Sequence, residues 1–248
     1  MPTNYNLEKI KFATDPATFE RAVNLYEKNK ITRFEKELNG FFATVIGTKS
    51  YNVYISKTHF GRGSCDCYLG ERDILCKHMV ATAIYAVKNG KPLKSEEKEI
   101  VDMPICSGKL GELNKEELLT VKKAITQAIK YIKSYQGPSK TWFAYQNSLN
   151  EGCARLSAIV SKLPVSQQTA DLLIDLLLRL DKKLCTGGVD DSNGAVGGFI
   201  EGTVITLQKY TKLDKNCIKS FEKLYQQDTC FGWESPLIRI FDERDIDN

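Results

Sequence analysis

Four residues with metal-binding side chains lie close together in the first third of the chain. Cys65 and Cys67 are separated by one residue, and Cys76 and His78 repeat that spacing after eight further residues. Three thiolates and one imidazole are a complete set of soft and borderline donors for one tetrahedral zinc ion. Because these donors fill all four positions, the pattern predicts one structural Zn²⁺ bound by Cys65, Cys67, Cys76 and His78.

These cysteines allow three other interpretations. Buried free cysteine is common in protein cores, but here the cysteines lie in a glycine-rich turn among polar residues. A redox-active dithiol would leave Cys76 and His78 without a role, and a disulfide between Cys65 and Cys67 would close a very small, strained ring. The spacing therefore favours metal binding.

The segments on either side of the four ligands predict how they are positioned. Gly61 and Gly63 precede the first ligand, and we expect them to provide positive φ angles for the sharp bend that two closely spaced ligands need. After His78, apolar residues recur at helical spacing as far as Val87. Cys76 and His78 are therefore predicted to lie on the first turn of a helix, which Asn89-Gly90 ends.

Upstream of the ligands, the sequence predicts one helix and a three-stranded antiparallel sheet. Residues 1–13 are expected to be a polar lead, and Asp15-Pro16 provides an N-cap and a first-turn proline for a helix. The three strands are expected at residues 31–38, 41–46 and 51–55. Asn39-Gly40 is a strong hairpin signal between the first two strands. Because so small a sheet buries little apolar surface, zinc binding should be coupled to folding.

The second half of the chain shows helical periodicity throughout. Residues 91–114 are predicted to be a linker between a zinc-finger domain, residues 1–90, and an all-helical domain, residues 115–248. Five helices are expected in the latter, at residues 115–133, 139–162, 166–184, 194–210 and 214–227. The apolar tail from Trp233 to Phe241 either packs on these helices or docks a partner. The predicted fold class is α+β: a small antiparallel sheet with a zinc-stabilised turn and helix, then an all-α domain of helical hairpins or a bundle.

The ligand spacing, Cys-x-Cys-x₈-Cys-x-His, resembles the SWIM-type zinc finger, and the resemblance covers residues 16–88. Bacterial and archaeal SWIM proteins have a few strands before the finger, a helix from its histidine and a helical C-terminal half. The loop at residues 190–194 also resembles one in bacterial SWIM proteins. SWIM domains are associated with DNA binding and with protein–protein contacts, so the resemblance implies an interaction module and leaves both kinds of partner open.

Composition adds broad limits. The net charge of +4 and the pI near 8.5 permit an anionic partner without requiring one. The start of the chain has no apolar signal segment, and the longest apolar run is interrupted by charges, so we expect no membrane association and a cytoplasmic location, or a nuclear one in a eukaryote. The remaining cysteines are expected to be buried free thiols in a reducing compartment, without a second metal site; they are Cys106, Cys153, Cys185, Cys217 and Cys230.

Nucleic acid, either DNA or a single strand, is one candidate partner. Arg62, Arg72 and Lys77 are close enough to the ligands to meet phosphates, and Tyr68 lies in the loop between the ligand pairs, where it could stack on a base. The first 90 residues carry thirteen basic and nine acidic side chains, which is a weak excess. An ordinary solvated surface is therefore the competing interpretation.

The alternative function is that of a protein–protein adaptor, in which residues 115–248 dock a partner and no nucleic acid is bound. An enzyme is not predicted, because the chain lacks the common phosphate-binding, dinucleotide-binding and hydrolase motifs. The only histidine besides His78 is His59, which is expected to be a surface residue or a support for the zinc ligands.

Overall fold

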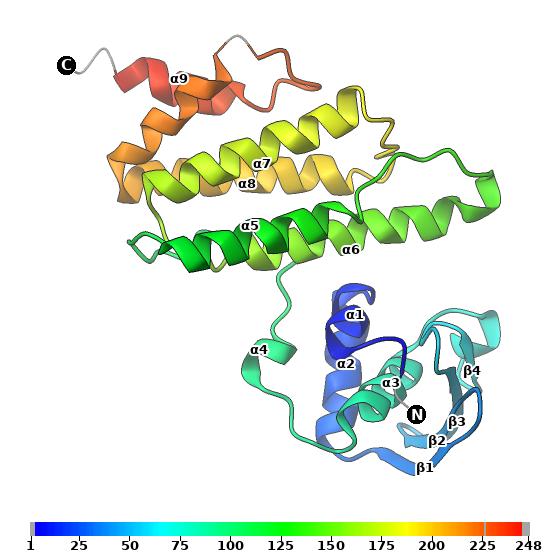
Figure 1. Ribbon diagram of the computed structural model, residues 1–248. Coiled ribbons are helices and arrows are strands. Elements are labelled where there is room, and N and C mark those ends of the chain that lie inside the picture. The colour runs from blue at the N-terminus through cyan, green and yellow to red at the C-terminus, as the bar shows by residue number, and fades with distance from the viewer. Residues whose placement is uncertain (1–2, 226, 245–248) are drawn as a thin grey trace. The chain divides into compact units, whose positions relative to one another are not determined.

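The computed structural model describes residues 3–225 and 227–244 and divides the chain into two compact units (Figure 1). The first unit runs to Ile100 and the second begins at Val101, so the division falls inside the predicted linker, residues 91–114. The first unit holds a four-stranded antiparallel sheet and the second is helical, which confirms the predicted α+β class. Whether each unit folds independently stays a prediction.

The described residues of the first unit form the α-helices α1 (Leu7–Phe12), α2 (Pro16–Glu27), α3 (Lys77–Lys88) and α4 (Ser95–Lys98), and the short 3₁₀ helix η1 (Gly70–Arg72). The N-cap of α2 is as predicted, since the Asp15 carboxylate accepts from the Thr18 N–H at 2.9 Å. The expectation of a polar lead at residues 1–13 is wrong. Leu7 and Ile10 of α1 are buried, but a helix of six residues contains too few apolar positions to show a clear period.

The sheet has the order β1-β2-β3-β4, and every neighbouring pair is antiparallel. Its strands are β1 (Ile31–Lys36), β2 (Gly40–Ile46), β3 (Ser50–Ser56) and β4 (Gly63–Cys65). The prediction of three strands missed β4, because a strand of three residues has no visible alternation. Helix α3 packs on this sheet and α2 packs on α3 (Figure 1). The sheet therefore leads directly into the first cysteine of the predicted zinc site.

The hairpin between β1 and β2 forms where predicted, but the role of its glycine differs. Leu38 and Asn39 form the turn, since the Glu37 N–H donates to the Gly40 carbonyl at 3.0 Å. Gly40 lies in β2, where a Cβ atom would come within 2.3 Å of the Tyr54 ring and 2.5 Å of the Ile55 carbonyl oxygen. Close approach of the neighbouring strand, and not turn geometry, therefore requires glycine at this position.

The second unit contains the predicted run of helices. The helices of this unit are α5 (Lys115–Ile129), the short 3₁₀ helix η2 (Ser139–Thr141), α6 (Trp142–Val160), α7 (Gln167–Cys185), α8 (Ala195–Leu213), the 3₁₀ helix η3 (Lys215–Leu224) and an additional helix, α9 (Ser235–Arg244). Asn114 and Glu117 form a capping box at the start of α5. The fifth predicted helix is 3₁₀ rather than α. Helix α7 contributes Leu173, Leu177 and Leu180 to the buried core of this unit.

The apolar tail packs on its own unit. Trp233, Leu237 and Phe241 are all buried in the core of the second unit, and α9 was not predicted. The interpretation of this tail as a docking segment is therefore wrong, because its apolar side chains are already covered. Residues 245–248 of the tail lie outside the described residues.

Part of the predicted linker is attached to the helical unit. The Ile105 N–H donates to the Ser161 hydroxyl at 3.0 Å, and the Ser107 hydroxyl donates to the Leu163 carbonyl at 2.6 Å. Leu110 and Val165 form a parallel bridge. These contacts involve the turn between α6 and α7.

The loop at residues 190–194 caps α8. Both carboxylate oxygens of Asp191 accept backbone hydrogen bonds, from Val196 at 2.9 Å and from Gly197 at 2.8 Å. Asp190 accepts from the Trp142 indole at 2.9 Å. The acidic pair therefore has a structural role at a helix N-terminus, where negative charge is favourable. None of the helices within residues 3–225 and 227–244 is long and apolar enough to cross a membrane.

Candidate metal centre

The structure brings the four predicted ligands together. One donor atom from each of Cys65, Cys67, Cys76 and His78 lies within 4.8 Å of all the others, and all four residues are buried. Cys65 ends β4, Cys67 lies in the following turn, Cys76 is the N-cap of α3 and His78 is in its first turn. These four side chains could hold one metal ion, which would join the sheet to the helix.

The distances within the cluster fit a tetrahedral ion. The Nδ1 atom of His78 lies 3.7 Å from the Cys65 sulfur and 3.9 Å from the Cys76 sulfur. Metal bonds of about 2.3 Å to sulfur and about 2.0 Å to nitrogen at tetrahedral angles place these donors about 3.6 Å apart. The cluster therefore has nearly the dimensions of an ion-binding site, and only small shifts would complete it.

The sequence did not indicate which nitrogen of His78 is the ligand. Its Nδ1 faces the thiols, while the Tyr51 ring stacks on the imidazole at 4.2 Å. Its Nε2 is buried and has no hydrogen-bond partner among the residues that the structure describes. Metal binding through Nδ1 would place the proton on Nε2, where a buried donor without a partner costs about 1–3 kcal/mol.

The pKa values of two of the thiols, Cys65 and Cys76, are shifted in opposite directions by their contact with each other. A hydrogen bond from the Cys65 thiol holds the pKa of Cys76 below its usual value, and hydrogen bonds from His78 and the Met79 N–H act in the same direction. The same bond with Cys76 raises the pKa of Cys65, and burial adds to the increase. A divalent cation bound between them would hold both sulfurs as thiolates.

Glycine positions the cysteines by close approach. A Cβ atom at Gly70 would lie 2.2 Å from the Cys65 carbonyl oxygen, and the Gly70 N–H donates to the Cys67 sulfur at 3.4 Å. Gly63 contacts the Tyr54 carbonyl in the same way, with a Cβ distance of 2.1 Å. The expectation of positive φ at Gly61 and Gly63 is wrong, because neither has one. Gly70 was missed because only the folded chain brings it against Cys65.

Asp66 lies between the first two cysteines and hydrogen-bonds their turn to Asn52 of β3. Its carboxylate accepts from the backbone N–H of Asn52 at 3.0 Å and from the side-chain amide of Asn52 at 3.1 Å. The Asp66 N–H donates in return to the Asn52 carbonyl at 3.3 Å. Asp66 thus fixes the turn that carries both thiols and is not itself a member of the ligand cluster, and sequence spacing alone could not reveal its partner.

Replacing Asp66 with alanine should weaken metal affinity by about 10–100-fold, as is typical when a group that orients metal ligands is lost. Competition with a zinc-binding dye would measure the change. Asp66→Asn is the matched control, because its amide oxygen can still accept from the Asn52 N–H, and it should lose less. Equal affinity in Asp66→Ala and the unmodified chain would contradict the role given to Asp66.

Of the four candidate nucleic-acid residues, Tyr68 and Arg72 contact each other, and Arg62 and Lys77 lie outside this contact. Tyr68 is 70% exposed, and the Arg72 guanidinium lies 3.6 Å from the centre of its ring. Arg72 also donates to the Tyr68 carbonyl at 2.8 Å. Arg62 is exposed and Lys77 is half-buried at the start of α3. The loop also exposes Leu69 and Ile74, two apolar residues that sequence reasoning did not single out.

His59 lies outside the ligand cluster. Its Nδ1 accepts from the Gly61 N–H at 3.2 Å, and its ring stacks beside Phe60. Burial and the positive charge of Arg62 lower the pKa of His59.

The remaining cysteines agree with the expectation of buried free thiols only in part. Cys153 and Cys217 are buried free thiols, as expected, and burial raises the pKa of each to about 12. Cys106 is only half-buried. Cys185 and Cys230, however, form a disulfide, and both are exposed. Together with Asp181 they form a second group of metal-ligand type, which the sequence did not predict because the cysteines are 45 residues apart.

No family model matches the chain, and it has no significant match among curated proteins or solved structures.

Proposed function

We propose that the first unit is a SWIM-type interaction module stabilised by one structural Zn²⁺. The buried cluster of Cys65, Cys67, Cys76 and His78 is the observation that carries this proposal. Thiolate and imidazole are the ligands that Zn²⁺ prefers, and four of them complete its coordination. No position is then left for a reacting water, so the proposed role of the ion is folding, and that of the module is binding rather than catalysis.

The position of the cluster supports a structural ion. The three cysteines belong to the same buried core as Val53 of β3 and Ile84 of α3. The ligands come from the end of β4 with its following turn and from the start of α3. An ion there would therefore cross-link a small sheet to the helix that covers it, which such a sheet needs for stability.

The segment between the ligand pairs is the proposed contact surface. We call residues 68–75 the ligand loop; it exposes Tyr68, Leu69 and Ile74, and the Arg72 guanidinium lies over the Tyr68 ring. Because Cys67 and Cys76 anchor its ends, an ion would order this loop before a partner arrives, which reduces the entropic cost of binding. An exposed aromatic ring beside a cation suits stacking on a nucleic-acid base and contact with phosphate.

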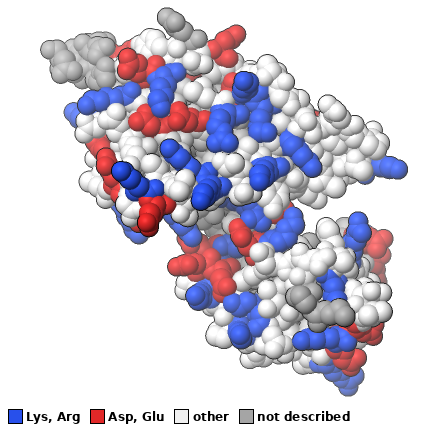
Figure 2. Space-filling view, in the orientation of Figure 1, with Lys and Arg blue, Asp and Glu red and all other residues white. Residues whose placement is uncertain are grey.

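Charge around the ligand loop supports a local contact. Figure 2 shows Lys and Arg interspersed with Asp and Glu on the visible face of the first unit. Binding would therefore depend on Arg62, Arg72 and Lys77 more than on a broad positive field. Since the Tyr68 ring offers stacking, which suits unpaired bases, the proposed partner is a single strand in preference to a duplex.

Titration of a labelled single strand and a labelled duplex at two salt concentrations tests this proposal. Affinity should fall steeply with salt, with a log–log slope of about −0.7 per phosphate contacted on a single strand and about −0.9 on duplex DNA. Reversing Arg62, Arg72 and Lys77 to glutamate should weaken binding and flatten that slope. Tyr68→Ala should cost about 1–3 kcal/mol, and more on the single strand.

Lys122, Lys123 and Lys209 provide a matched control, because they are exposed on the second unit. Their reversal to glutamate changes the net charge equally and should leave the slope unchanged. If neither nucleic acid binds at low salt, the nucleic-acid partner is ruled out, and docking of a protein through residues 115–248 becomes the explanation to test.

A further inference from the structure

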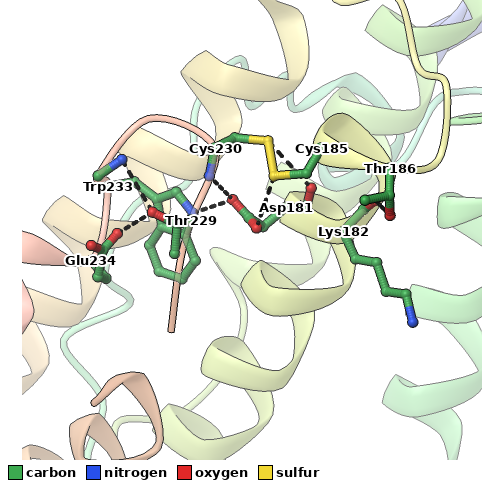
Figure 3. Close-up of a disulfide and its surroundings, with 9 residues drawn as sticks. Asp181, Lys182, Cys185, Thr186, Thr229, Cys230, Trp233 and Glu234 are labelled. Atoms are coloured by element: carbon green, nitrogen blue, oxygen red, sulfur yellow. Dashed lines mark hydrogen bonds between the residues drawn. A yellow bond between two sulfur atoms is a disulfide. The ribbon is translucent and has the colours of Figure 1, made fainter. Parts of the chain in front are cut away.

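The helical unit contains a cysteine pair that the zinc module does not use. Cys185 is the last residue of α7, and Cys230 lies in the segment before α9. Figure 3 shows the disulfide between them, with Asp181 beside it on the preceding turn of α7. The pair closes a loop of 45 residues that includes all of α8 and η3.

Asp181 holds the two segments together independently of the sulfur–sulfur bond. Its Oδ1 atom accepts from the Cys230 N–H at 2.9 Å and from the Trp233 indole at 2.8 Å. Both Asp181 and Trp233 are buried. Hydrogen bonds to a buried carboxylate are strong, so this contact should keep the two cysteines adjacent when the disulfide is open.

When the disulfide is reduced, the Cys185 thiol also has a hydrogen-bond acceptor nearby. The Oδ2 atom of Asp181 lies 3.4 Å from the Cys185 sulfur. In the reduced chain the Cys185 thiol can donate to this oxygen, which keeps its sulfur close to Cys230. The two sulfurs therefore stay close enough for the disulfide to form again after it has been reduced.

Exposure separates this pair from the other cysteines. Cys185 and Cys230 are exposed, whereas Cys153, Cys217 and the three cysteines of the metal centre are buried. Thiol–disulfide exchange requires an attacking thiolate to reach a sulfur in line with its bond, so accessible cysteines react selectively.

We propose that Cys185 and Cys230 are a reversible redox site whose co-reactants are small-molecule thiols and disulfides such as glutathione. A thiolate of the pair attacks glutathione disulfide, forming a mixed disulfide and releasing one glutathione thiolate. The second protein thiolate then attacks the protein sulfur of that mixed disulfide and releases the second. The two protein thiols are oxidised, one glutathione disulfide is reduced to two thiols, and the two protons pass to the products.

The proposed redox site lies entirely within the helical unit, so it does not depend on the proposed function of the zinc module. Its bond ties the end of α7 to the segment that carries Trp233 and leads into α9. Cross-linking restricts the unfolded chain, so oxidation should stabilise this unit. The midpoint of its urea unfolding should be higher for the oxidised chain than for the reduced one.

The full zinc-loaded chain, equilibrated in glutathione buffers of graded oxidised-to-reduced ratio, tests the proposal. Alkylation of free thiols followed by peptide mass spectrometry should show Cys185 and Cys230 oxidised together in one transition, while Cys153 and Cys217 stay reduced. In Cys185→Ser, Cys230 should instead retain glutathione. A pair that stays reduced at every ratio, or carries separate glutathione adducts without an internal bond, would overturn the proposal.

Asp181 provides a second test, as a positioning residue. Asp181→Ala should require an oxidised-to-reduced ratio about ten-fold higher for half-oxidation, because the two sulfurs lose their alignment. Asp181→Asn retains an oxygen acceptor for the Cys230 and Trp233 N–H groups and should shift less. A second equivalent of zinc bound by the reduced chain, and lost in Cys185→Ser, would overturn the redox assignment in favour of a metal site.

Discussion

Replacing Cys76 with serine should remove the zinc ion and unfold the first unit. Cys76 is buried and is the N-cap of α3, where its thiolate would join that helix to the end of the sheet through the proposed ion. Structural zinc contributes a binding free energy of about 10–16 kcal/mol, and a domain is stable by only about 5–15 kcal/mol. Loss of the ion should therefore exceed what the small core of this unit can offset.

Metal analysis and hydrogen exchange would measure this effect. Zinc content should fall towards zero, and exchange protection should disappear from the residues before Ile100 while the helices after Val101 keep theirs. The second result also tests whether the two units fold independently. Cys106→Ser is the matched control, because it removes a half-buried thiol outside the cluster. A Cys76→Ser variant that keeps both its zinc and the protection of α3 would contradict the account.

Gly70→Ala should also impair the metal centre, although no ligand is changed. The new methyl group would lie 2.2 Å from the Cys65 carbonyl oxygen and 2.6 Å from the Cys65 Cβ. Both are atoms of a ligand residue held in β4, so relief of the clash must displace that ligand. Overpacking of this kind costs about 1–3 kcal/mol, which would lower zinc affinity by about 5–150-fold.

Gly198→Ala is the control for Gly70→Ala, because it makes the same substitution at a position where the added methyl group causes no clash. Gly198 lies inside α8, where an added Cβ meets no atom within 4 Å. Alanine is favoured over glycine in a helix by about 1 kcal/mol, so this control should be neutral or stabilising. Zinc affinity in Gly70→Ala that equals the affinity of the control would show that Gly70 does not position Cys65.

Local patterns accounted for the features that could be predicted from the sequence. The four ligands occupy fourteen residues, 65–78, and their types and spacing are sufficient to group them. Helix α7 was predictable because its 19 residues contain several full turns of apolar periodicity, and Ser166 provides a recognisable N-cap. Local signals of this kind survive folding because tertiary packing reinforces them.

Features that depend on distant contacts could not be predicted. The hydrogen bond between Asp66 and Asn52 and the disulfide between Cys185 and Cys230 form only when folding brings these residues together. The close approach of Gly70 to Cys65 has no sequence signature either, because any glycine in a turn has the same local pattern. Short elements such as β4 fail for a different reason: three residues cannot display a period.

The central claim is that one zinc ion is bound by Cys65, Cys67, Cys76 and His78, and metal analysis of protein purified without added metal tests it most directly. The expected ratio is near one zinc per chain, and it should fall towards zero when Cys65→Ser is combined with Cys76→Ser. A ratio near zero in the unmodified chain, or zinc retained by the double variant, would contradict it.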